Sequence, residues 1–210
     1  MKIGHRGAMA CEPENTLASF QKAIEMGADM IELDVHLCKT GELAVIHNES
    51  VDRTTNGKGL VTEKTLAELK TLNAGKGQAI PTLGEVFDLV DKRVGINIEL
   101  KGKGTSEPTA EIIRRYKNKE WDGGLFVVSS FDREELKNFR KCDSNTRIGV
   151  LFEKVSTDLF DFAKSISAYS IHVPRKKFSV ELMQEAKGLG FKVFVWTVDS
   201  PEEIEKLKNI

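Results

Sequence analysis

The sequence predicts a TIM (β/α)8 barrel with a small insertion after its second strand. Beyond residue 80, short apolar segments alternate with amphipathic segments, which is typical of parallel βαβ units. Seven strand–helix units can be counted, more than an open sheet of about five or six strands would hold. The length of 210 residues fits one barrel, so residues 1–210 are expected to form a single domain. An eighth parallel strand is not found, and the predicted barrel therefore lacks its last strand.

The N-terminal elements follow from local patterns. An apolar stretch ending at Gly4 predicts a strand that leads into a loop. Pro13-Glu14-Asn15-Thr16 is typical of a helix start, and the amphipathic run from Leu17 to Met26 predicts the helix. Apolar and polar residues alternate from Ile31 to His36, which predicts a strand with its polar side chains on one face. Leu43 to His47 predicts a hairpin partner for that strand.

The rest of the chain divides into an insertion and a regular alternation. Residues from about 48 to 80 are polar and glycine-rich, and we expect them to form the insertion, with a short helix at 66–72. A helix is expected to follow from Pro81 to Val90. Strands are then predicted at 95–101, 125–131, 147–152, 168–173 and 192–198, and helices at 109–116, 133–139, 157–164, 180–189 and 201–207.

Composition excludes several classes of partner. With 31 basic and 32 acidic residues, the net charge of −1 gives no reason to expect binding to nucleic acid or to an anionic membrane. No apolar run approaches the roughly 18 residues of a membrane span, so stable membrane insertion is not expected. The N-terminus has no apolar signal-peptide core, which predicts a cytoplasmic protein. The three cysteines lack CxxC spacing and are expected to be reduced thiols rather than zinc ligands. The oligomeric state stays open.

Two acidic residues share one face of the strand from Ile31 to His36. Glu32 and Asp34 would lie about 7 Å apart, where like charges repel and a buried carboxylate needs a neutralising cation. A bound divalent cation would resolve this repulsion. The alternative is an edge strand whose acids lie in water.

The strand at 95–101 repeats this pattern. Asn97, Glu99 and Lys101 would face the barrel interior, where charge is tolerated mainly near the C-terminal mouth. Catalytic residues of such barrels also lie at that mouth. We therefore expect the acids of both strands and Lys101 to converge there with His5, Arg6 and His47.

These residue types indicate phosphate-ester cleavage. Three carboxylates offer only oxygen donors, which suits Mg²⁺ or Ca²⁺ better than zinc. Arg6 and Lys101 can bind an anion, and two histidines can divide the roles of general base and general acid. Phe131 and Trp196, at strand ends, are either core residues or an aromatic wall of the pocket. His36 is expected to have a structural role, and His172 to be a hydrogen-bonded histidine of the interior.

Several motifs resemble those of the glycerophosphodiester phosphodiesterases, in order and in spacing. The resemblance extends from residue 2 to about residue 207. The motifs are His5-Arg6-Gly7, Pro13-Glu14-Asn15-Thr16, Glu32-Leu33-Asp34-Val35, Val45-Ile46-His47, Asp52-Arg53-Thr54-Thr55-Asn56-Gly57, Pro81-Thr82-Leu83, Glu99-Leu100-Lys101, Ser130-Phe131-Asp132 and Val195-Trp196-Thr197.

The resemblance implies hydrolysis of glycerophosphodiesters to an alcohol and sn-glycerol 3-phosphate, dependent on a divalent cation: Mg²⁺, Ca²⁺ or Mn²⁺. It implies that His5 and His47 are the acid/base pair and that Arg6 and Lys101 contact the phosphate. The metal ligands it implies are Glu32, Asp34 and Glu99.

Two departures from the family pattern keep alternatives open. Asn48 follows His47 where the family usually has aspartate, and the family's final strand is not found. A barrel that binds glycerophosphodiesters without turnover is therefore one alternative. A lysophospholipase D-type activity on longer lipid substrates is another, which an apolar groove beside Phe131 and Trp196 would favour.

Overall fold

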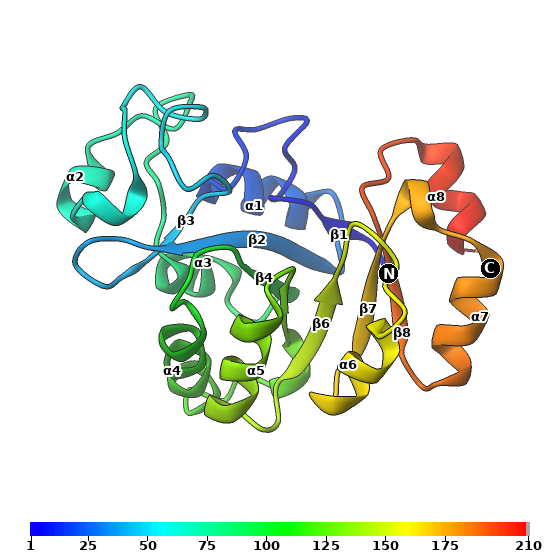
Figure 1. The fold of residues 1–210 in the computed structure, drawn as a ribbon. Coiled ribbons are helices and arrows are strands. Elements are labelled where there is room, and N and C mark those ends of the chain that lie inside the picture. Colours follow the sequence, from blue (N-terminus) through cyan, green and yellow to red (C-terminus); the bar gives the residue numbers. More distant parts are fainter. Residues whose placement is uncertain (209–210) are drawn as a thin grey trace.

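The computed structural model describes residues 1–208, which form one curled sheet with helices packed around it (Figure 1). The sheet has eight strands in the order β1-β2-β4-β5-β6-β7-β8, and β3 pairs with β2 outside this series. The series is parallel throughout, whereas β3 is antiparallel to β2. The strands are β1 Ile3–Gly4, β2 Met30–Leu37, β3 Leu43–Val45, β4 Gly95–Leu100, β5 Phe126–Ser130, β6 Arg147–Leu151, β7 Ser170–Pro174 and β8 Lys192–Trp196. The predicted TIM-barrel architecture and the hairpin are confirmed.

Helices occupy the predicted segments, with ends shifted by a few residues. Thr16, Thr65 and Thr82 cap the first three helices, each accepting a hydrogen bond from a backbone N–H of the first turn. The α-helices are α1 Leu17–Glu25, α2 Leu66–Lys70, α3 Leu83–Val90, α4 Ser106–Lys117, α5 Arg133–Cys142, α6 Leu159–Ser165, α7 Val180–Gly188 and α8 Pro201–Lys208, and the 3-10 turns are η1 Val61–Glu63, η2 Gly123–Leu125 and η3 Arg175–Lys177. No helix in this described part of the chain is long and apolar enough to cross a membrane.

The apolar faces of β2 and β4 point toward the helices. Ile31, Leu33 and Ile98 belong to one buried cluster with Phe20 of α1 and Phe87 of α3. Because side chains alternate along a strand, the polar residues of β2 and β4 point into the barrel instead. The register places Asp34 opposite Glu99, so the predicted acidic residues of the two strands become neighbours.

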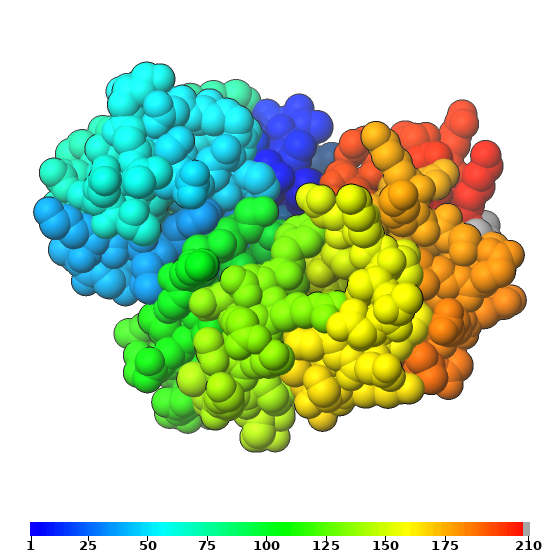
Figure 2. All heavy atoms as spheres, in the orientation of Figure 1, coloured from blue at the N-terminus to red at the C-terminus, as the bar shows by residue number. Residues whose placement is uncertain are grey.

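The insertion between β3 and α3 packs around a second, smaller hydrophobic cluster. That cluster joins residues of the β2–β3 hairpin to residues of η1 and α2 and to the loops around them. Its buried members are Cys38, Ala44, Ile46, Val51, Val61, Leu69, Ala74 and Ile80. In the space-filling view the insertion forms a lobe beside the barrel (Figure 2). The hairpin therefore connects the insertion to the strand that carries Glu32 and Asp34.

The two ends of the parallel series are β1 and β8. Within residues 1–208, β1 pairs only with β2, and β8 pairs only with β7. The ends nevertheless approach each other at the mouth of the barrel, where Thr197 Oγ1 lies 3.5 Å from His5 Nδ1. Residues just beyond β1 and β8 thus contribute to the same site.

Candidate active site

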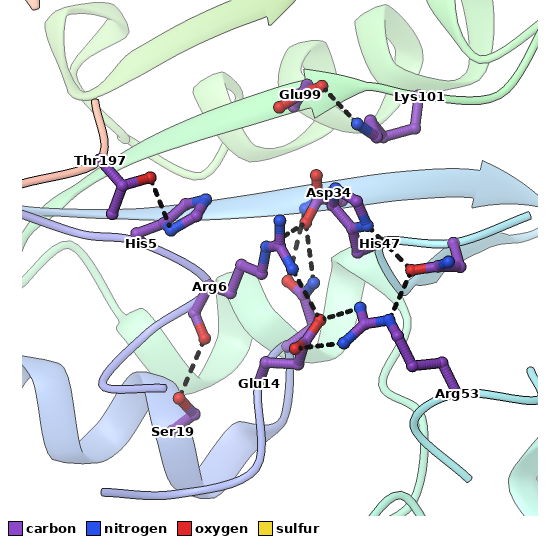
Figure 3. A network of polar contacts seen from close by, with 12 residues as sticks. His5, Arg6, Glu14, Ser19, Asp34, His47, Arg53, Glu99, Lys101 and Thr197 are labelled. Carbon is purple, nitrogen blue, oxygen red and sulfur yellow. Dashed lines mark hydrogen bonds and ion pairs between the residues drawn. The ribbon is translucent and has the colours of Figure 1, made fainter. Parts of the chain in front are cut away.

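Three carboxylates meet at the C-terminal mouth of the barrel, and Figure 3 shows two of them, Asp34 and Glu99. Glu32 and Asp34 extend from β2 and Glu99 from β4, and one oxygen of each lies within 4.8 Å of the others. All three are buried, with 7, 1 and 8% of the residue exposed. The structure thus brings together the three acids for which the sequence predicted convergence.

Burial and mutual repulsion make these carboxylates hard to ionise. Burial, with the charges of Asp34 and Glu99, raises the pKa of Glu32 well above its ordinary value. Burial and the charge of Asp34 raise the pKa of Glu99 to about 7, although Lys101 acts in the opposite direction. Glu99 Oε1 is buried and has a cationic neighbour, Lys101 Nζ, at 3.1 Å. Clustered oxygen donors that lack sufficient cationic neighbours fit a hard metal ion, and this cluster could hold one.

Backbone and amide groups orient the carboxylates. The backbone N–H of Arg6 donates to Glu32 Oε2 at 2.8 Å, which joins the end of β1 to β2. Asn15 Nδ2 donates to Asp34 Oδ2 at 2.8 Å, and the amide oxygen of Asn15 accepts from the Asp34 backbone N–H at 3.4 Å. Asn15 has φ of 56°, a left-handed conformation that asparagine tolerates better than most residues. The turn before α1 therefore supports the acidic cluster.

Two arginines share the carboxylate of Glu14. Arg6 Nη1 donates to Glu14 Oε1 at 3.0 Å, and Arg6 Nε lies 3.6 Å from Asp34 Oδ2. Arg53, from the insertion, donates to both oxygens of Glu14 at 2.8 and 2.6 Å. Burial alone would raise the pKa of Glu14, but the hydrogen bond from Arg53 and the charge of Arg6 lower it to about 2. Glu14 therefore stays ionised and holds Arg6 at the edge of the acidic cluster.

The two predicted acid/base histidines both lie at this mouth (Figure 3). His5 Nε2 lies 3.9 Å from Glu32 Oε2. His47 Nδ1 lies 2.9 Å from Asn48 Oδ1, and His36 Nε2 contacts the backbone oxygen of His47 at 3.1 Å. Burial lowers the pKa of His5, with a further contribution from the charge of Arg6, and burial also lowers the pKa of His47.

An aromatic pair lies next to the charged groups. The rings of Phe131 and Trp196 meet edge to face, with their centroids 5.6 Å apart. Lys101 Nζ lies 5.6 Å from the centre of the Phe131 ring and 3.1 Å from Glu99 Oε1. Trp196 Nε1 donates to the backbone oxygen of His172, and Phe131 is 36% exposed. The pair therefore lies beside Lys101, which contacts Glu99, and a role as a pocket wall stays a prediction.

Several residues of the site were not predicted from the sequence. Glu14, Asn15 and Thr197 each contact a predicted site residue. Arg53 contacts Glu14 and Asn48. All four belong to motifs that carry the family resemblance, and membership of these motifs could have identified them as site residues. His172, by contrast, lies in the interior as expected, where its Nε2 is 2.9 Å from Ser170 Oγ.

The fold and the site together define a class of protein. Buried carboxylates, cationic side chains and two histidines at the C-terminal mouth of a TIM barrel are typical of hydrolases that act on phosphate esters. The model of the glycerophosphoryl diester phosphodiesterase family matches residues 5–210. The chain belongs to this family and is thus a phosphoric diester hydrolase.

Relatives and solved structures agree with this family. The chain is 41% identical to a glycerophosphodiester phosphodiesterase of Caldanaerobacter subterraneus, over 98% of this chain and 88% of the relative. It is similar in structure to an Oleispira antarctica phosphodiesterase in complex with the product sn-glycerol-3-phosphate, with a TM-score of 0.91, 29% identity and coverage of 100% of this chain and 89% of that one. A glycerophosphodiester phosphodiesterase from Thermotoga maritima matches with a TM-score of 0.81 and 33% identity, over 98% of this chain and 89% of that one.

Proposed function

We propose that the protein hydrolyses glycerophosphodiesters to an alcohol and sn-glycerol 3-phosphate, with a bound divalent cation and acid/base catalysis by His5 and His47. The observation that carries the proposal is the convergence of three buried carboxylates and these histidines at one barrel mouth. The names of the similar proteins, and the product bound to the Oleispira antarctica phosphodiesterase, support the substrate class.

The carboxylates of Glu32, Asp34 and Glu99 would hold the cation. Their donor atoms are all oxygens, which favours Mg²⁺ or Ca²⁺, with Mn²⁺ as a further candidate. When bound, the cation would polarise the phosphate oxygens and stabilise the negative charge that develops on them.

The chain's own groups bind the substrate and move its protons. Arg6 and Lys101 attract the phosphate anion, the first through a planar guanidinium and the second as a point charge. One histidine accepts the proton of the attacking hydroxyl, from water or from the glycerol 2-hydroxyl, as the new P–O bond forms. The other donates a proton to the leaving alcohol oxygen as its P–O bond breaks.

The proposal is tested by a metal-by-substrate assay. Glycerophosphocholine and glycerophosphoethanolamine are incubated with Mg²⁺, Mn²⁺ or Ca²⁺, and release of glycerol 3-phosphate is measured. We expect release to need a cation and to fall by about 100-fold or more in His5→Ala and His47→Ala. Unchanged rates in these variants, or release at full rate in a chelator, would contradict the proposal.

A second candidate is cleavage of lysophospholipids in the manner of a lysophospholipase D. The partly exposed Phe131 ring against Trp196 favours it, because an apolar surface at the mouth could contact an acyl chain. The test compares an acylated substrate with its deacylated form. Failure to cleave any acylated substrate rejects this candidate. If glycerophosphodiesters raise the melting temperature of the protein but no product is released, both candidates are rejected in favour of a barrel that binds its ligand without turnover.

A further inference from the structure

The guanidinium of Arg53 lies between two groups of the site (Figure 3). Its Nη1 and Nη2 atoms bind the carboxylate of Glu14. Its Nε donates to Asn48 Oδ1 at 2.9 Å, and the same oxygen lies 2.9 Å from His47 Nδ1. A continuous chain of hydrogen bonds thus runs from Glu14, beside the acidic cluster, through the insertion to His47.

The chemistry of these groups fixes the hydrogen positions along the chain. An arginine Nε only donates, so the Asn48 atom that faces it must be the amide oxygen rather than the amide nitrogen. An amide oxygen only accepts, so His47 Nδ1 must carry the hydrogen in this bond. In a neutral imidazole the other ring nitrogen, Nε2, then has a free lone pair.

We propose that Arg53 is a positioning residue, which acts through the Asn48 amide to hold His47 as the tautomer with its hydrogen on Nδ1 and with Nε2 free to accept a proton. Without Arg53 the Asn48 side chain could rotate by half a turn and present its amide nitrogen, which would favour the opposite tautomer. Glu14 keeps Arg53 in place, because it binds the guanidinium through both of its oxygens.

The other charged groups near His47 do not take over this task. Asp34 of β2, Lys101 after β4 and Arg6 after β1 act on His47 through their charges. His36 of β2 contacts the backbone oxygen of His47, so it orients the backbone rather than the ring. Among the hydrogen bonds of the described residues, the Asn48 amide is the ring partner, and Arg53 determines which end of that amide faces His47.

This inference rests on the proposed function and assigns the two histidine roles within it. His47 accepts the proton of the attacking hydroxyl at Nε2 while the P–O bond forms, and it becomes an imidazolium whose Nδ1 hydrogen still binds Asn48. His5 is then the group that donates a proton to the leaving alcohol oxygen. The insertion, through Arg53, thereby contributes to catalysis without touching the substrate.

The tautomer is tested directly by NMR of protein labelled with ¹⁵N-histidine, without cation or substrate, so that the result does not depend on activity. A His47→Gln spectrum identifies the His47 signals. We expect a protonated-type Nδ1 and an unprotonated Nε2 in the wild type, and a mixture of tautomers in Arg53→Met. The opposite tautomer in the wild type, or an unchanged tautomer in Arg53→Met, would overturn the inference.

Kinetics then separate positioning from folding. We expect Arg53→Met to lower kcat by about 10- to 100-fold with little change in KM. The double variant Arg53→Met/Asn48→Ala should have the same kcat as Asn48→Ala alone, because both substitutions remove the same function, the positioning of His47. Arg53→Lys should not restore kcat, since an ammonium cannot bind both oxygens of Glu14 and the amide in this fork geometry. Independent, additive effects would contradict action through Asn48.

Lys58→Met is the matched control. Lys58 lies in the same insertion, pairs with Asp52 at 3.5 Å and has an 80% exposed side chain. Its replacement removes a cation from the insertion but leaves the Arg53–Asn48 bond intact, so kcat should stay at the wild-type level. An equal loss of kcat in Lys58→Met would show that the general charge of the insertion matters, which would overturn the positioning role. A wild type without phosphodiesterase activity would instead reject the proposed function, leaving the NMR result to decide the tautomer.

Discussion

The barrel interior has a charged half and a neutral half. In the charged half, β2 and β4 place Glu32, Asp34 and Glu99 side by side, and burial and repulsion raise the pKa of both glutamates. In the neutral half, β7 places His172 inside, where its partner is Ser170. A Cβ atom on Gly149 of the adjacent β6 would lie 2.2 Å from His172 Nε2, so the missing side chain makes room for the ring.

The two halves handle buried polar groups in different ways. In the neutral half, His172 has a hydrogen-bond partner in Ser170 and space beside Gly149, so the chain alone satisfies this polar group. In the charged half, the carboxylates outnumber the cationic side chains beside them. Their negative charge is balanced only when a cation binds. Unbalanced charge, rather than polarity as such, therefore distinguishes the candidate site from the rest of the interior.

Glu32→Gln should have the largest effect, because it removes charge from the unbalanced half. We expect activity to fall by about 1,000-fold, because weaker binding of the cation removes several kcal/mol of transition-state stabilisation. The cation-free variant should melt at a higher temperature than the cation-free wild type, since a repelling buried carboxylate is gone. Thermal scans with and without Mg²⁺ measure both stability and cation-dependent stabilisation. A lower melting temperature together with retained stabilisation by Mg²⁺ would contradict the charge argument.

His172→Gln tests the neutral half through the pH dependence of folding stability. Burial lowers the pKa of His172 to about 3, whereas an unfolded histidine titrates near 6.5. The unfolded chain therefore binds more protons between these values, and the folded protein loses on the order of 5 kcal/mol of stability as the pH falls through this window. Denaturant unfolding at a series of pH values should show a shallower acid loss in the variant. Equal slopes for both proteins would show that His172 is not the residue responsible.

Asn48→Asp should have a smaller effect that appears only in the pH profile. A carboxylate accepts the hydrogens of His47 and Arg53 as the amide does, but its charge stabilises the imidazolium and raises the pKa of His47. Since the proposed base must be neutral, the acidic limb of kcat/KM should move up by about 0.5 to 1 pH unit. Rates between pH 5 and 8 at saturating cation measure the shift, and a shift toward lower pH would argue against His47 as the base.

Phe131→Ala should have the smallest effect, because it removes a ring contact with Trp196 and Lys101 and changes no acid, base or metal-ligand candidate. Loss of an aromatic pair costs about 0.5 to 1.5 kcal/mol, so KM for substrates with a large leaving group should rise by about two- to tenfold. Kinetics with glycerophosphates of increasing leaving-group size test this. A large fall in kcat with an unchanged KM would instead connect the ring to the reacting groups.

Much of this organisation could be predicted because it depends on short-range periodicity. Alternation along 31–36 and 95–101 determines which side chains face inward, and parallel pairing then makes Asp34 and Glu99 neighbours. The chain of bonds through Arg53 could not be found in this way. It depends on how the insertion folds back over the turn before α1, bringing Arg53 to Glu14 across 39 positions of sequence. No local pattern encodes that contact, although both residues lie in motifs shared with the family.

The sharing of Glu14 between two arginines has a consequence for the order of binding. Around the site, Arg6, Arg53 and Lys101 face four carboxylates, those of Glu14, Glu32, Asp34 and Glu99. Burial and repulsion oppose full ionisation of Glu32 and Glu99 before a cation binds, and with all of these groups ionised the site would carry one net negative charge, which repels a phosphodiester anion. A divalent cation reverses that sign and leaves one net positive charge, which matches the single charge of the substrate. Charge balance thus favours an ordered sequence, in which the cation enters first and the diester follows.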